Sequence, residues 1–288
     1  MIPLHDDNPV RERAVVVYLV IGLCVGIFLW QLGLGERQGR AVVASLGMIP
    51  AELFGLKRPT GAFAIPEWST ILTSMFLHGG VLHLAGNMLF LWVFGNNVED
   101  AMGHLRFVAF YLLCGAAAAL AQALVDPGSP IPMIGASGAI AGVLGAYLLL
   151  YPQARVLTLI PFLLFYTVRL PAWVVLGLWF GAQIVNSLTA DLSKGGVAWL
   201  AHVGGFVAGV LLIGLFKRRD VALLGGAADM QASYEALRAR PRPPIVERAG
   251  PALTRVKLRD LPSTIRHPRA GSVPRAGSAP VRTRSPWR

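Results

Sequence analysis

The sequence predicts an all-α, polytopic membrane protein: a bundle of six transmembrane helices followed by a disordered carboxy-terminal tail. Of its 288 residues, 55% are hydrophobic and only 14% are charged, whereas a soluble domain carries about 25% charged residues. The mean hydropathy is +0.58. Six apolar segments are also each close to the roughly 20 residues that a helix needs to cross a bilayer.

We expect the six helices at residues 14–34, 79–98, 107–125, 133–151, 170–188 and 196–216. The first is predicted to be a retained helix and not a signal peptide, because Asp6 and Asp7 precede it and no small-residue cleavage site follows. The long connection at residues 35–79 contains three prolines, and we expect it to have structure of its own.

A shorter apolar run, residues 156–167, lies between the fourth and fifth segments. Pro161 interrupts it, and Arg155 and Arg169 bracket it. A run of this length is more often interfacial or re-entrant than spanning. The sequence therefore predicts a loop that dips into the membrane surface here, and no seventh crossing.

The net positive charge of the chain is concentrated at its carboxy-terminal end. Residues 217–288 contain 16 Lys and Arg but only 5 Asp and Glu, so this segment accounts for the whole net charge of +11. We predict a cytoplasmic amino-terminal segment at 1–13, a membrane domain at 14–216 and a basic, Pro- and Arg-rich, largely disordered tail at 217–288. Six spans place both termini on one side, and the basic residues favour the cytoplasm for that side.

The basic tail is expected to face membrane lipids, whose anionic headgroups attract Lys and Arg. Nucleic acid is not expected as a partner, because no nucleic-acid-binding motif accompanies the charge. Cys24 and Cys114 both fall inside apolar runs and are typical of small buried hydrophobic residues. They predict neither a disulfide framework nor a metal site.

Polar residues in membrane segments are costly and are usually functional, and three motifs contain them. These are Gly135-Ala136-Ser137-Gly138, Ala201-His202-Val203-Gly204-Gly205, and a segment from His78 to Asn87 that reads HGGVLHLAGN. Each has a purely structural interpretation when taken alone. The serine is typical of helix packing, the histidine of a proton relay, a haem or metal ligand or a structural group, and the third motif of a polar helix face.

The three motifs are predicted to lie at the same depth in the membrane. The second, fourth and sixth helices run in the same direction, and His83, Ser137 and His202 lie four, four and six residues after their predicted starts. At about 1.5 Å per residue, the three side chains are expected within a few ångströms of one depth, just below the outer surface.

Small residues predict that two of these helices touch. In the fourth helix one face contains Ser137, Ala141 and Gly145, and in the sixth one face contains His202, Gly205 and Gly209. Small residues at this spacing let membrane helices approach closely, which is what a hydrogen-bonded serine and base require. No aspartate lies at this depth in the second, fourth or sixth helix, so the prediction is a Ser–His dyad and not a triad.

With GASG, AHxGGxxxG and HGGxxHxxxN in this arrangement, residues 68–209 resemble the rhomboid intramembrane serine proteases. The resemblance implies a six-helix bundle whose water-filled cavity opens to the outside. It implies Ser137 as nucleophile and His202 as general base. His83 and Asn87 would donate to the oxyanion together with the Ser137 backbone N–H, and His78 would have a supporting role.

The resemblance also implies that Glu99 holds the 35–79 connection and that residues 191–196 form a flexible cap. Two positions depart from the pattern. Ala141 stands where some members stack an aromatic ring on the catalytic histidine, and Ser69 follows Trp68 where some members have arginine. Neither change removes a catalytic atom, but the orientation of the histidine must then come from elsewhere.

The expected activity is endopeptidase cleavage of transmembrane segments of other proteins near the outer surface, without a cofactor. The expected location is a bacterial plasma membrane with both termini cytoplasmic. One alternative is a haem- or metal-binding membrane protein using His78, His83 and His202, which gives Ser137 no role. Another is a non-catalytic rhomboid-like binder of membrane segments. A transporter is disfavoured, because no inverted repeat and no charged midplane residue is found.

Overall fold

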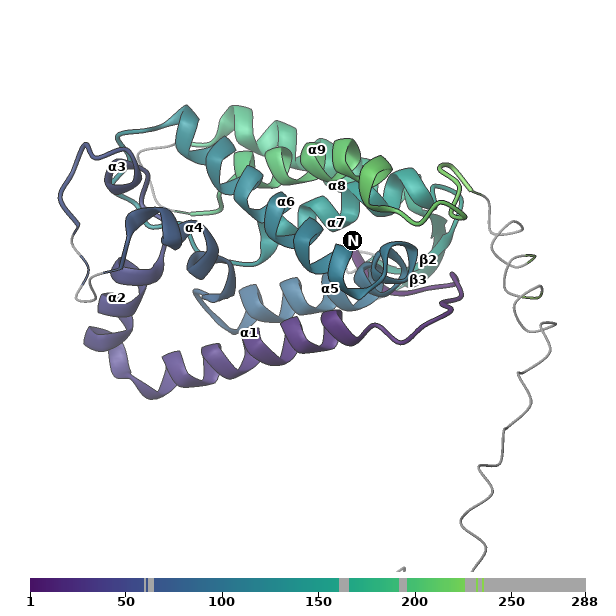
Figure 1. Ribbon diagram of the computed structural model, residues 1–288, viewed down its shortest axis with the longest axis horizontal. Helices are drawn as coiled ribbons and strands as arrows, with labels where there is room; N and C mark the ends of the chain where they lie inside the picture. Colours follow the sequence, from purple (N-terminus) through teal and green to yellow (C-terminus); the bar gives the residue numbers. More distant parts are fainter. Residues whose placement is uncertain are drawn as a thin grey trace, which may run out of the picture. The chain divides into compact units, whose positions relative to one another are not determined.

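The structure, a computed structural model, describes residues 1–59, 61, 65–160, 166–191, 196–225, 232 and 235. Its elements in chain order are β1 (Ile2–Asp6), α1 (Val15–Gly33), α2 (Gly35–Leu46), α3 (Pro50–Leu53), η1 (Glu67–Ser69), α4 (Thr70–Thr73), η2 (Ser74–Phe76), α5 (Val81–Met102), α6 (His104–Val125), α7 (Ser137–Leu150), β2 (Arg155–Ile160), β3 (Tyr166–Pro171), α8 (Ala172–Thr189) and α9 (Trp199–Phe216). Figure 1 shows that the long helices lie together as a bundle.

The predicted polytopic helical fold is confirmed. Each of the six expected segments contains a helix, and five helices among the described residues are long and apolar enough to cross a membrane: α1, α5, α6, α8 and α9. The exception is α7, which is equally apolar but has only 14 residues. As expected, the 35–79 connection has structure of its own, including α2, α3 and α4.

The start of α7 differs from the prediction, and the difference concerns the serine. Residues 133–136 are not helical, because Met133 pairs with Met48 of the 35–79 connection and the Gly135 N–H donates to the Ser74 carbonyl at 2.9 Å. The helix therefore begins at Ser137 itself. Fourteen residues rise about 21 Å, well short of a hydrocarbon core about 30 Å thick, so α7 can begin below the membrane surface.

Helices α7 and α9 pack together through glycine. A β-carbon on Gly205 would overlap the Gly138 carbonyl oxygen, and one on Gly209 would overlap that of Gly142. The α9 face agrees with the prediction. On α7 the contact is made by Gly138, Gly142 and Gly145. Gly145 belongs to the expected face, whereas Gly138 and Gly142 take the places expected for Ser137 and Ala141.

Where it can be compared, the segment at residues 156–167 forms strands and not the expected loop. Strands β2 and β3 form an antiparallel hairpin, and β1 adds to it, so that Asp6 pairs with Val156. Val156 and Thr158 are both buried, which is the alternation expected of a half-buried strand. The pairing strand comes from residues 2–6, about 150 positions away, and no local pattern reveals it. Residues 161–165 lie outside the described residues.

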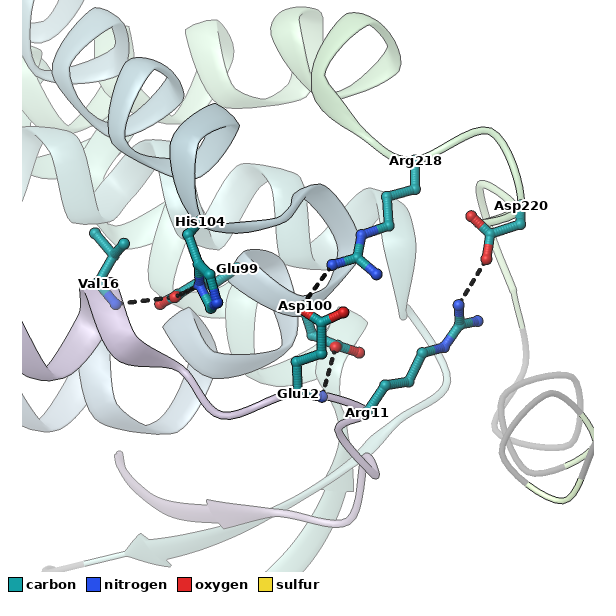
Figure 2. Close-up of polar contacts among 8 residues, drawn as sticks. All are labelled: Arg11, Glu12, Val16, Glu99, Asp100, His104, Arg218 and Asp220. Carbon is teal, nitrogen blue, oxygen red and sulfur yellow. Dashed lines mark hydrogen bonds and ion pairs between the residues drawn. The ribbon is translucent and has the colours of Figure 1, made fainter. Parts of the chain in front are cut away.

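A polar network joins the ends of α1, α5 and α9 beside this sheet (Figure 2). The buried carboxylate of Glu99 accepts hydrogen bonds from the N–H groups of Val16 and Val17, at 2.9 and 2.8 Å. It also lies 2.6 Å from Nδ1 of His104. Glu99 therefore caps the first turn of α1, where N–H groups lack helical partners. Its expected contact with the 35–79 connection is wrong, because that connection follows the far end of α1.

The residues after α9 return to the same network. The Arg218 N–H donates to the Ala101 carbonyl at 2.8 Å, and the Arg218 guanidinium pairs with Glu12 at 2.9 Å. Arg11 pairs with Asp220, as Figure 2 also shows. The first residues of the predicted tail are thus tied to the helical unit up to residue 225. Most of the rest of the tail lies outside the described residues.

Candidate active site

Two helix starts bring Ser137 and His202 together. Ser137 is the first residue of α7, and His202 lies in the first turn of α9. The Ser137 Oγ is 2.8 Å from the His202 Nε2, which is a hydrogen-bonding distance. The glycine contacts between α7 and α9 lie directly below this pair, so the approach of the two backbones sets the distance between the two side chains.

The other ring nitrogen of His202 meets a residue that sequence analysis did not single out. The Gln183 Oε1 of α8 lies 2.8 Å from the His202 Nδ1, and the Gln183 Nε2 donates to the Trp179 carbonyl one turn earlier at 3.1 Å. Both Gln183 and His202 are buried, at 5% and 8% exposure. The signal that could have found Gln183 was an amide side chain within an apolar membrane segment.

Two tryptophans enclose the imidazole. The Trp179 ring centroid lies 5.9 Å from that of His202 with the planes 36° apart, and the Trp199 ring meets it edge-on at 6.0 Å. Ala141 has no ring to place against the imidazole and is fully buried in α7. The aromatic support of the histidine therefore comes from α8 and α9.

His83 and Asn87 face the same space from α5. The Gly79 N–H donates to the His83 Nδ1 at 3.4 Å, which makes Nδ1 the acceptor and leaves Nε2 as the N–H of that ring. A β-carbon on Gly135 would lie 2.8 Å from the His83 Nε2 and 3.7 Å from the Ser137 Oγ. The His83 Nε2 and the Ser137 Oγ therefore both border the small space next to the Gly135 α-carbon.

Asn87 presents an unused donor. Its side chain is 8% exposed, and its Nδ2 has no hydrogen-bond partner among the described residues. Buried polar atoms without partners are rare in folded proteins. This one lines the cavity that Ser137 and His202 also line, so its hydrogen bond is free for a bound group.

His78 lies behind His83. Its ring is 2% exposed and 5.2 Å from the His83 ring, centroid to centroid, and neither of its nitrogens has a partner among the described residues. Burial lowers the pKa of His78 to about 4, so the ring is neutral at physiological pH. The His78 backbone N–H donates to the Gln31 Oε1 at 3.2 Å, which connects the start of α5 to α1.

One cavity of about 1270 Å³ contains the site. Its lining includes Ser137, His202, His83, Asn87 and Gln183. Asp191 and Gly196 border it too, but residues 192–195 of the expected cap lie outside the described residues. Among the described residues, no three His, Cys, Asp or Glu side chains are grouped so as to hold a metal ion. His78, His83 and His202 therefore do not form such a group.

The Rhomboid domain family model matches residues 66–219, which is more than half of the chain and includes Ser137, His202, His83, Asn87 and Gln183. The chain belongs to the rhomboid family. This membership, with the apolar helices, identifies an integral membrane protein and supports an intramembrane protease-like function.

The chain is also similar to curated rhomboid relatives. The chain is 33% identical over 193 residues to Rhomboid protease GluP of Bacillus subtilis, covering 67% of this chain and 33% of that protein. It is 33% identical over 147 residues to Rhomboid protein 1, mitochondrial, of Saccharomyces cerevisiae, covering 49% and 40%. Rhomboid-like protein 11, chloroplastic, of Arabidopsis thaliana is 28% identical over 185 residues, covering 62% and 64%. The chain thus spans less than two thirds of the length of each of these relatives.

Proposed function

We propose that this rhomboid is an intramembrane serine endopeptidase in which Ser137 is the nucleophile and His202 its general base. The observation that supports this most directly is the 2.8 Å separation of the Ser137 Oγ and the His202 Nε2 at the wall of a cavity. A serine is a weak nucleophile unless an adjacent base takes its proton. The Ser137 hydroxyl attacks the scissile carbonyl carbon while its proton passes to Nε2, and His202 then protonates the leaving amine.

The charge that develops on the carbonyl oxygen needs hydrogen-bond donors, and the start of α7 supplies some. The first N–H groups of a helix have no intrahelical partner and carry the positive end of the helix dipole. The Asn87 Nδ2 and the His83 Nε2–H face the same cavity from α5. We assign these groups to the oxyanion site, with His78 supporting His83 from behind.

The proposed substrate is a transmembrane segment of another protein. A helical amide is shielded by its own turn, so the segment must unwind locally before Ser137 reaches its carbonyl, and helix-breaking or small residues near the cut favour this. Water from the cavity then hydrolyses the acyl-enzyme. No step requires a cofactor.

We propose that the termini and the basic tail face the cytoplasm and that the cavity opens on the opposite side of a bacterial plasma membrane. Arg11 and Arg218 lie at one end of the bundle, the end where β1 lies and where α9 terminates. Arg155 of β2 and Arg169 of β3 lie in the same sheet as β1. Basic residues at one end favour the cytoplasm for that end. Reporter fusions at residue 225 that are active only outside the cytoplasm would contradict this orientation.

The function is tested by labelling the purified protein with a fluorophosphonate probe. We expect wild-type protein to be labelled and to cleave a reporter with one transmembrane helix that contains small residues near its outer end. Ser137→Ala should lose both activities while remaining folded. Ser129→Ala removes another hydroxyl that lines the cavity and should label as wild type does. Wild-type protein that binds the reporter without labelling or cleavage would favour the non-catalytic alternative.

A further inference from the structure

The side chain of Gln183 links His202 to the Trp179 carbonyl in a hydrogen-bond chain with a defined direction. Its Nε2 lies 3.1 Å from the Trp179 carbonyl oxygen, which can only accept, so Nε2 must face it as the donor. The Gln183 Oε1 is thereby directed at the His202 Nδ1, 2.8 Å away. Because an amide oxygen carries no proton, a hydrogen bond here requires that Nδ1 carries one.

That requirement decides the state of the opposite ring nitrogen. In a neutral imidazole one nitrogen donates and the other accepts. With the proton on Nδ1, the Nε2 lone pair faces the Ser137 Oγ at 2.8 Å and can accept its proton. With the proton on Nε2 instead, Nδ1 and the Gln183 oxygen would be two acceptors facing each other at 2.8 Å.

We infer that Gln183 is the positioning residue of the dyad, holding His202 in the tautomer and orientation that accept the proton of Ser137. This rests on the proposed function of Ser137 and His202. The amide takes the place that a carboxylate has in a Ser-His-Asp arrangement without adding a charge to a buried site. Trp179, four residues earlier on the same face of α8, packs on the same imidazole, so α8 provides both the orienting hydrogen bond and a ring contact.

The first experiment compares rates of fluorophosphonate labelling at Ser137 in Gln183→Met, Gln183→Glu and wild type. Methionine keeps the length and flexibility of the side chain but has no amide oxygen. We expect the rate constant to fall about 10- to 100-fold, as for the loss of a buried hydrogen bond that orients a catalytic group. Glutamate keeps an oxygen acceptor for Nδ1 and, in its protonated form, a donor for the Trp179 carbonyl, and should restore most of the rate. The matched control is Asn186→Met, an amide of α8 that does not line the cavity.

The rate constant and the labelled fraction separate positioning from folding. A residue that only stabilises the fold would lower the fraction of protein that labels and leave the rate constant of that fraction unchanged. A wild-type rate constant in Gln183→Met would overturn the inference while leaving Ser137 as nucleophile. Absence of Ser137 labelling in wild type would instead remove the proposed function itself.

A second measurement needs no folded variant at Gln183. Nitrogen-15 NMR of wild-type protein labelled at histidine reports which ring nitrogen carries the proton, and a His202→Ala sample identifies the His202 signals by difference. We expect a proton on Nδ1 and none on Nε2 at neutral pH. A His202 population protonated on Nε2 alone would contradict the inference, whatever the labelling rates are.

Discussion

Gly209 of α9 lies so close to Gly142 of α7 that a β-carbon on Gly209 would overlap the Gly142 carbonyl oxygen. The same relationship links Gly205 to Gly138, one turn nearer the site. Neither overlap involves the flexible end of a side chain. Any larger residue must therefore separate the two helices, and the separation extends to the serine and histidine at their starts.

Gly209→Ala should therefore destabilise the protein and slow the labelling of Ser137. Overpacking of a tight interface costs about 1–3 kcal/mol, and here the obstacle is backbone. Gly214→Ala is the matched control on the same helix, because a β-carbon on Gly214 meets nothing within 4 Å. Alanine is also a better helix former than glycine, so this variant should not be destabilised. Thermal unfolding can be followed through the reaction of the buried Cys24 and Cys114 with a thiol-reactive dye. Equal unfolding temperatures for the two variants would contradict the prediction.

Gly135→Ala should impair catalysis for two separate reasons. Gly135 has a φ of +125°, which side-chain-bearing residues rarely adopt. Its added β-carbon would also lie 2.8 Å from the His83 ring. We expect kcat for reporter cleavage to fall at least about tenfold, since small displacements of catalytic groups are costly. Gly128→Ala, where a β-carbon has open space, should keep the wild-type kcat. A wild-type kcat in Gly135→Ala would show that His83 is not held for catalysis.

Asn87→Ala should lower kcat about 10²–10³-fold, the usual effect of removing one oxyanion donor. Its Nδ2 has no partner among the described residues, so the substitution breaks no hydrogen bond made by that donor. The unfolding temperature should therefore remain near the wild-type value. Steady-state cleavage and thermal unfolding measured on one preparation test both parts. A marked loss of stability with unchanged kcat would make Asn87 structural.

The stability of the protein should fall as the pH rises past the pKa of Asp6. This carboxyl is 3% exposed and accepts a hydrogen bond from the Tyr147 hydroxyl at 2.6 Å, and burial raises its pKa from 3.8 to about 6. The folded state thus binds the proton more tightly than the unfolded state. The stabilisation that this tighter proton binding gives the folded state is fully present below pH 3.8 and is lost as the pH rises through about 6. Its amplitude is on the order of 3 kcal/mol.

Asp6→Asn should flatten this dependence, because the amide does not titrate. The measurement is the unfolding temperature between about pH 4 and pH 7, inside the window set by the pKa. If wild type and Asp6→Asn follow parallel curves, Asp6 does not titrate in this window.

Much of the fold was predictable because its cause is local. Each apolar segment is long enough to require burial in lipid, and glycines at helical spacing permit close packing wherever they occur. For the same reason the three motifs predicted that Ser137, His202 and His83 would lie near one another. The short α7 was not predictable in this way, since its start depends on contacts of residues 133–135 with Met48 and Ser74.

The sequence by itself determined the membrane class, the six helices and the residue types at the site, because lipid restricts polar residues to places where they are needed. Only the tertiary structure decided which partners they meet. The strand pairing of β1, the cap that Glu99 provides for α1 and the contact of Gln183 with His202 each join residues between 19 and about 150 positions apart. Such contacts depend on how helices rotate and approach one another, and no periodic pattern along one segment records that rotation.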